Sequence, residues 1–505
     1  DSLIVTGTTT LVGTTNLDIV DIDGAVDMAT TLAVAGNVDF NGDLDVDGTS
    51  NLDIIDVDGA ANFAADVTFA DGADIITATA GTSNLRLGVN AGNSIASGGN
   101  YNVVVGDEAG TAITTGDNNV LIGAFTGDAL TTGTFNVAVG TSALGTDILG
   151  NRSVAVGNNA LTTQNPASAV DMYNVAVGYA AGLSVTTGIQ NTFVGGTTGQ
   201  ATTDADYNVA MGYGALYTNT LGSKSTAIGV SALQNQNFTT ATDSFNTAVG
   251  YTAGAAITTG TSNTIIGAEA GNNITTGGGN FAAGYGSLTN DTKGNSSIAI
   301  GSLALLSQNF TTSTNAYNVA IGEQAGRNIT TGTNNTLIGA LAGDAITDAD
   351  GNIAVGSLAL SANTVGSSSV AMGYAALATQ NPATATTMYN TAVGASAGTA
   401  VTTGIQNTII GGLAGDALTD ADFNIAIGYA ALGADTLGSN STAIGWSALA
   451  AQNFTSATLS YNTAVGFKAG LAVTTGIQNT LIGGLAGDAL LAAADNVAVG
   501  FEALS

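Results

Sequence analysis

Residues 174–178 read NVAVG, and close variants of this pentapeptide recur along most of the chain. Their glycine stands at positions 88, 106, 123, 140 and 157, then at 178, 195, 212 and onward to 500. From Gly106 the steps are 17, 17, 17 and 21, so four copies make one repeat unit, and the unit recurs at a spacing of 72. Stacked coils need such spacing, because each coil must present the same side chains to its neighbours. The spacing predicts a parallel β-solenoid, or β-roll, of 24 coils over residues 81–505.

The pentapeptide has two faces. In a strand, Val175 and Val177 lie on one face and Ala176 on the other, which carries small residues in most coils. A 17-residue coil at roughly 3.3 Å per residue has a perimeter of only about 56 Å, which encloses one layer of side chains. We therefore expect the small apolar face to be uncovered in a single chain and to be covered by other copies in a homotrimer. A monomeric solenoid is the alternative. Larger residues replace the small one at a spacing of 72, in the series Leu121, Phe193, Ile265, Leu337, Ile409 and Leu481.

A polar residue stands four positions before each glycine. It runs Asn, Asn, Asn, Ser, as in Asn174, Asn191, Asn208 and Ser225. Amide side chains at one height in every coil are able to bond to the coils above and below. This pattern predicts a ladder of hydrogen bonds along the stack.

Every fourth coil carries four extra residues after the motif. Each extra loop contains a proline or a phenylalanine. In one interpretation these residues are exposed tips that contact a receptor, since loops commonly carry binding function. In the other, the loop folds back to cap a groove between chains. The candidate contact residues are Pro166, Phe238, Phe310, Pro382 and Phe454.

Residues 1–80 follow a different period. TTNLDIVDIDGA at 14–25 returns as TSNLDIIDVDGA at 49–60. Apolar and acidic residues alternate strictly there, which is typical of strands with one buried face. Isolated strands of this kind are marginally stable. We expect residues 1–80 to form an acidic shaft, a triple-stranded β-helix or β-prism in which three chains enclose the apolar side.

Composition excludes several functional classes. The chain has 37 acidic and 6 basic residues, a net charge of −31, so nucleic acids and anionic membrane surfaces are disfavoured partners. No apolar run approaches the roughly 18 residues of a membrane span, and no membrane insertion is expected. There is no histidine or cysteine. We expect no catalytic residues and no enzymatic activity; a carboxylate pair that cleaves glycans is the chemical alternative.

Two sets of aspartates are candidate calcium ligands, since calcium prefers carboxylate oxygens. DxDG sequences occur at 21–24, 45–48 and 56–59, where strand alternation alone also explains exposed aspartates. The second set follows the pattern GDAxTDAD, for which a solvated turn is the alternative. No other cofactor is predicted. The second set consists of Asp344, Asp348, Asp350, Asp416, Asp420 and Asp422.

The repeats resemble two known groups of proteins. SVAVGNNAL (153–161), STAIGVSAL (225–233) and NTAVGYTAG (246–254) resemble the head repeats of trimeric autotransporter adhesins. Repeats of the form NTAVGYxAG…TTGxxNT are also similar to those of bacteriophage tail fibres. The resemblance covers residues 81–505 and implies left-handed parallel β-roll coils in an intertwined trimer. With steps of 17 and 21, the coils are longer than those of the autotransporters, and the resemblance implies nothing about a receptor.

Together these features predict an all-β homotrimeric fibre, a parallel β-roll with an amino-terminal shaft. We expect it to be extracellular, as a bacteriophage tail fibre or receptor-binding fibre shaft that mediates host attachment. Its partners would be two further copies of the chain and a host-surface receptor, either a glycan or a protein. The alternative is the head of a bacterial cell-surface trimeric adhesin or an extracellular matrix filament.

Overall fold

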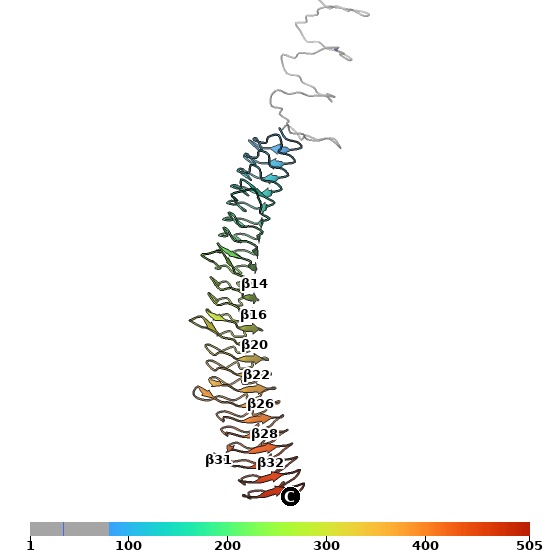
Figure 1. Ribbon diagram of the computed structural model, residues 1–505, viewed down its shortest axis with the longest axis vertical. Coiled ribbons are helices and arrows are strands. Elements are labelled where there is room, and N and C mark those ends of the chain that lie inside the picture. Colours follow the sequence, from blue (N-terminus) through green and yellow to red (C-terminus); the bar gives the residue numbers. More distant parts are fainter. Residues whose placement is uncertain (1–33, 35–79) are drawn as a thin grey trace, which may run out of the picture. The chain divides into compact units, whose positions relative to one another are not determined.

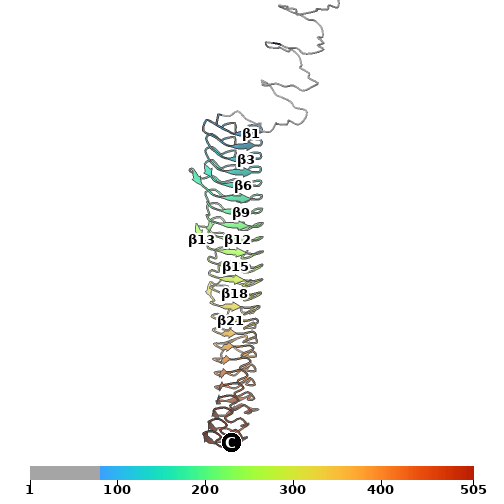
Figure 2. The same ribbon diagram turned by 90° about the vertical axis from the view of Figure 1, so that its right-hand side faces the viewer.

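The computed structural model describes Val34 and residues 80–505, and all structural statements below refer to them. The shaft predicted for residues 1–80, with its DxDG sequences, lies outside the described residues except for Val34 and Ala80. Residues 81–505 form an all-β parallel solenoid of about 24 turns without helices (Figures 1 and 2). Nothing in residues 80–505 forms an apolar helix of membrane-spanning length.

Each turn contributes one strand of three residues to a parallel sheet that runs the length of the solenoid. The register repeats the motif without slippage: Ala176 pairs with Phe193, and Val177 with Val194. In spatial order the strands are β1 (Leu85–Leu87), β2 (Val103–Val105), β3 (Val120–Ile122), β4 (Val137–Val139), β6 (Val154–Val156), β8 (Val175–Val177), β9 (Thr192–Val194), β10 (Val209–Met211), β12 (Thr226–Ile228), β14 (Thr247–Val249), β15 (Thr264–Ile266), β16 (Phe281–Ala283), β18 (Ile298–Ile300), β20 (Val319–Ile321), β21 (Thr336–Ile338), β22 (Ile353–Val355), β24 (Val370–Met372), β26 (Thr391–Val393), β27 (Thr408–Ile410), β28 (Ile425–Ile427), β30 (Thr442–Ile444), β32 (Thr463–Val465), β33 (Thr480–Ile482) and β34 (Val497–Val499).

The four-residue insertions add a ridge to every fourth turn. In each ridge, two strands of two residues pair in parallel outside the main sheet. The five pairs are β5 (Gly150–Asn151) with β7 (Val170–Asp171), β11 (Gly222–Ser223) with β13 (Thr242–Asp243), β17 (Gly294–Asn295) with β19 (Thr314–Asn315), β23 (Gly366–Ser367) with β25 (Thr386–Thr387), and β29 (Gly438–Ser439) with β31 (Thr458–Leu459).

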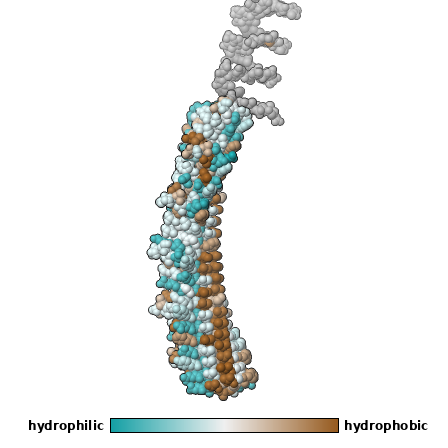
Figure 3. Space-filling view, in the orientation of Figure 1, coloured by the Kyte–Doolittle hydropathy of each residue, from teal (hydrophilic) through white to brown (hydrophobic). Residues whose placement is uncertain are grey.

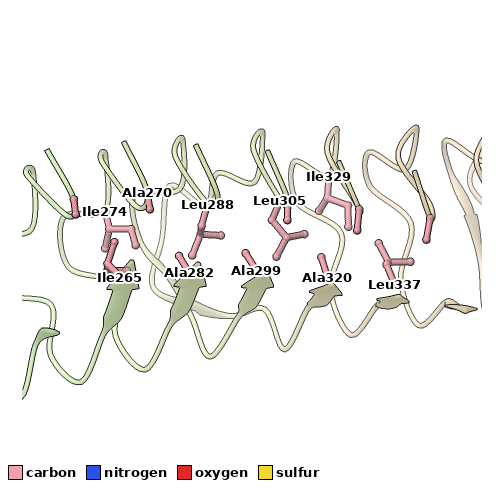
Figure 4. Packing of buried hydrophobic residues seen from close by; sticks show 14 of the residues in the cluster. Ile265, Ala270, Ile274, Ala282, Leu288, Ala299, Leu305, Ala320, Ile329 and Leu337 are labelled. Carbon is pink, nitrogen blue, oxygen red and sulfur yellow. The ribbon is translucent and has the colours of Figure 1, made fainter. Parts of the chain in front are cut away.

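The small face of the strands is the core of the single chain. Ala176 is 0% exposed, as are the other central alanines of the sheet up to Ala464. Figure 4 shows Ala282 and Ala299 on their strands, with Leu288 and Leu305 reaching toward them from the opposite side of the coil. The expectation that this face is uncovered in one chain was wrong, because the coil is so narrow that alanine on one wall and leucine on the other fill it.

A volume exchange explains the large residues spaced by 72. Phe193 replaces the central alanine and is fully buried. A Cβ added at Gly199 would lie 2.5 Å from its ring, and one added at Gly182 would lie 2.9 Å from it. The third and fourth turns of a unit, such as those of Ala210 and Ala227, have a central alanine and carry leucine four residues after the motif glycine, whereas the first turn, that of Ala176, has Gly182 there, beside the ring of Phe193. The ring of Phe193 thus occupies space that Gly182 and Gly199 leave free.

The predicted asparagine ladder is confirmed. The Asn191 backbone N–H donates to Asn174 Oδ1 at 2.9 Å, and the Asn208 N–H donates to Asn191 Oδ1 at 3.0 Å. The Asn191 side-chain amide also donates to the Ala205 carbonyl at 2.8 Å. These side chains are fully buried, so each satisfies backbone groups that water does not reach.

A glutamine continues the ladder where an insertion interrupts it. Gln236 Nε2 donates to the hydroxyl of Ser225 at 2.8 Å, and Asn246 Nδ2 donates to Gln236 Oε1 at 2.9 Å. Gln236 therefore bridges Ser225 and Asn246, the two ladder residues that the insertion separates. The insertion thus supplies its own polar link between units.

The motif glycine is required by close backbone stacking. Gly178 has φ 140°, a conformation that residues with a Cβ rarely adopt. A Cβ at this position would lie 2.5 Å from the carbonyl oxygen of Gly195 in the next turn. The same approach recurs up the stack, which explains why the repeat always contains glycine here.

Candidate functional site

The outer face of the main sheet is an apolar surface that runs the length of the solenoid. In β2 to β34 of the main sheet the central residue of each strand is buried and the two flanking residues are not. The flanking residues are valine, isoleucine or threonine in most turns. Val177 is 37% exposed and Ile266 is 43% exposed. We call these two columns the sheet face; the long apolar stripe in Figure 3 shows such a column continuing from turn to turn.

Aromatic residues line both sides of the sheet face. Many turns carry a ring five residues before the motif glycine or one residue after it. These rings are about half exposed, such as Tyr173 at 49%. The first column contains Tyr101, Phe135, Tyr173, Tyr207, Phe245, Tyr317, Tyr389, Phe423 and Tyr461; the second contains Tyr179, Tyr213, Tyr251, Tyr285, Tyr374, Tyr429, Trp446, Phe467 and Phe501.

Basic side chains lie among these rings. The Arg152 guanidinium is 4.9 Å from the Phe135 ring centre and 5.8 Å from that of Tyr173. Arg152 also pairs with Asp171 at 3.0 Å. Such exposed contacts are individually weak, so they add little to the stability of the fold.

One aromatic group departs from the repeat unit. Trp446 stacks between Tyr429 and Phe467, with ring centres 6.2 and 5.3 Å away and planes within 17°. The Lys468 ammonium lies 5.1 Å from the Trp446 ring. Because the rings cover one another's faces, they offer mainly their edges to an outside partner.

The predicted contact residues of the inserted loops are not exposed. Phe238, Phe310 and Phe454 are only 5–6% exposed, and Pro166 and Pro382 are buried. The first interpretation, of exposed aromatic or proline tips, was therefore wrong: these side chains fold back onto their own coil. Phe238, for example, lies where a Cβ on Gly222 would be 2.7 Å from its ring. The next three residues of each loop are exposed and small: 167–169, 239–241, 311–313, 383–385 and 455–457.

A buried carboxylate lies beneath three of the five insertions. Asp147 accepts hydrogen bonds from Gln164 Nε2 at 2.6 Å and from the Gly150 N–H at 2.7 Å. Burial raises the pKa of Asp147, and the hydrogen bonds oppose that rise only in part. Asp291 and Asp435 occupy equivalent positions, and burial likewise raises the pKa of each.

The other two insertions carry a neutral residue at this position. Asn219 Nδ2 donates to the Gly222 carbonyl at 2.7 Å, and its Oδ1 accepts from the Gly222 N–H at 3.1 Å. Asn363 makes the same pair of bonds with Gly366. The coil therefore accommodates an uncharged group there, and the carboxylate does not mark a site of its own.

Four of the predicted calcium ligands accept hydrogen bonds from the preceding turn of the solenoid. Asp348 accepts from a threonine hydroxyl of the preceding turn, and Asp350 accepts from a backbone N–H at 2.7 Å. Asp420 and Asp422 repeat these bonds one unit further along the chain, the second at 2.8 Å. Such hydrogen bonds are typical of a surface turn, the alternative interpretation of these aspartates.

The remaining two calcium candidates, Asp344 and Asp416, are also not part of a cluster of acidic side chains in the described part of the chain. Burial raises the pKa of Asp344, which the charge of Arg327 partly opposes, and burial also raises the pKa of Asp416. Within residues 80–505, no three acidic side chains are arranged to hold a metal ion.

Sequence reasoning overlooked the sheet face as the exposed surface. Its signal was present in the alternation of Val175 and Val177 about Ala176, which defined the two faces without saying which one is inside. No protein-family model matches the chain, and a comparison with curated proteins also finds no match.

Proposed function

We propose that this chain is a structural fibre protein that assembles as a homotrimer through the sheet face. The single observation that carries the proposal is the unbroken apolar column along all the turns of the solenoid, as Val177 and Ile266 exemplify. Large exposed apolar surfaces in soluble proteins mark interaction sites. The three chains would thus contact one another through the β-branched face of the strands. The sequence argument had relied on the small face instead.

The size of the sheet face supports association between copies. Three residues at about 3.3 Å across and 24 strands at about 4.8 Å along give roughly 1,100 Å² per chain. A standard protein interface buries about 800 Å² per partner. Copies of one chain match this face in length and spacing, since both partners have the same distance between turns.

The fibre is extracellular and belongs to a bacteriophage tail or receptor-binding fibre, where it holds an adhesive part away from the body that carries it. Support comes from the resemblance of the repeats to tail-fibre sequences and from a surface that repeats instead of forming one singular pocket. The receptor, a glycan or a protein, would be bound outside the repeated surface. The alternative is the head of a bacterial surface adhesin or a matrix filament, since the repeats also resemble adhesin head repeats.

Deletion of one complete unit tests the spacer role. Removing residues 179–250 joins Gly178 to Tyr251 and keeps the order of the turns. The fibre should shorten by roughly 19 Å, four turns at about 4.8 Å, and should still bind the surface that the intact fibre recognises. Electron microscopy and a cell-binding assay measure the two effects. A shortened trimer that no longer attaches would place a unique receptor site in the deleted unit and refute the spacer role.

A further inference from the structure

One turn of the sheet face differs from all the others. In β16 the first outward residue is Phe281 and the second is Ala283. Among the 24 strands of the main sheet, this is the only one with an aromatic ring in the first column and the only one with alanine in the second. The two exceptions therefore fall on the same turn.

The exceptions form a projection and a recess. The Phe281 ring remains 36% exposed on the sheet face. Ala283 pairs with Ile266 on one side and Ile300 on the other, so a short side chain lies between two long ones in its column. Neither change is needed by the core, which in this turn is formed by the buried Ala282 between the two and by Leu288 on the opposite wall.

We propose that Phe281 of one copy inserts into the recess at Ala283 of a second copy, which fixes the chains parallel and in register. The inference rests on the proposed self-association and adds its geometry. Elsewhere the sheet face is nearly uniform, so valine, isoleucine and threonine columns alone would permit slippage by whole turns. A single projection and recess at one height removes that freedom, as polar or shaped positions do in other repetitive interfaces.

The placement of the pair selects the parallel arrangement. Rotation about an axis parallel to the solenoid brings the first column of one copy against the second column of its neighbour at the same height. Phe281 then meets Ala283. Rotation about a perpendicular axis through this turn would bring each column against itself, and the two Phe281 rings would collide.

A filled recess gives opposite effects on folding and on association. Ala283→Val installs the residue type common in this column, so the fold of the single chain should keep its stability or gain slightly. Self-association should weaken at least about tenfold, equivalent to about 1.4 kcal/mol, because the ring loses its recess. The double variant Phe281→Val with Ala283→Val should restore association, since it recreates an ordinary turn. Analytical ultracentrifugation measures association and denaturant unfolding measures stability.

Cysteine trapping reports the register directly, because the chain contains no cysteine. A tagged Thr264→Cys chain is mixed with an untagged Ile266→Cys chain, whose cysteine lies on the same turn, β15. These two should form an intermolecular disulfide. The control partner is Ile228→Cys, two turns away at about 9.6 Å, beyond the roughly 7 Å limit for a disulfide. In the double variant at 281 and 283, trapping should spread to the control.

The outcomes separate this inference from the proposed function. A chain that is monomeric in every variant overturns the self-association itself. A trimer whose association is unaffected by Ala283→Val, or that traps the control pair as readily as the same-turn pair, overturns the role of Phe281 and Ala283 alone. Ala283→Val that destabilises the single chain without weakening association would show that the ring and the recess meet within one strand.

Discussion

The ring of Phe193 fills the space that Gly199 leaves, since a Cβ on that glycine would lie 2.5 Å from the ring. This relationship makes the four turns of a unit unequal. The second turn has a large residue in the sheet and glycine on the opposite wall, while the third has Ala210 in the sheet and Leu216 opposite. The core is therefore specified turn by turn, although its outer shape repeats.

The first prediction concerns this exchange. Ala210→Phe should destabilise the chain by roughly 1–3 kcal/mol, because it overpacks a turn whose opposite wall is already occupied. Adding Leu216→Gly, which copies the second turn, should recover part of the loss. Denaturant unfolding measures both variants. Equal stability of the single and double variants would contradict the exchange.

The second prediction concerns the polar ladder. Asn191→Ala removes acceptor and donor atoms from the buried N–H of Asn208 and the carbonyl of Ala205. Each unsatisfied buried group costs about 1–3 kcal/mol, so the unfolding free energy should fall by at least that amount. The exposed Asn165→Ala is the matched control and should have little effect. A loss no greater than in the control would show that the ladder adds nothing to stability.

The third prediction concerns pH. The pKa values of Asp147, Asp291 and Asp435 are raised by burial, so the folded chain binds protons that the unfolded chain has released. This contribution is fully present below the ordinary aspartate pKa of about 3.9 and is lost as the pH rises through the folded pKa values. Unfolding free energy should therefore fall with rising pH across this range.

Neutral replacements test the same point. The triple variant to asparagine copies Asn219 and Asn363, so it should be more stable than the native chain at pH 7 and should lose this part of the pH dependence. Asp107→Asn, at an exposed position, is the control. The explanation fails if the triple variant is less stable at pH 7 and keeps the native pH profile.

The fourth prediction concerns the inserted loops. Phe238→Ala should lower stability, with a cost near the lower end of the roughly 3–5 kcal/mol typical of buried phenylalanine. Thr240→Ala, on the exposed part of the same loop, should not. Thermal unfolding compares the two. If Phe238→Ala left stability intact but abolished attachment, the loop would be a contact surface after all.

The sequence predicted the number of turns and the asparagine ladder because both depend on spacing alone. It also marked Phe193 and the other large residues, since they interrupt a run of alanines. It did not predict which face of Val175–Ala176–Val177 is inside, because alternation defines two faces without choosing between them and the more apolar face is usually the buried one. Here the narrow coil reverses that choice. The burial of Phe238 was missed because a loop's direction depends on the coil beneath it.

The mass of the intact chain in solution is the most direct test of homotrimer formation. Light scattering on the chromatographed protein at micromolar concentration should give about three times the chain mass of 49.1 kDa, because association would cover the exposed sheet face. A mass of one chain, 49.1 kDa, would show that the sheet face is left in water and would rule out self-association through it.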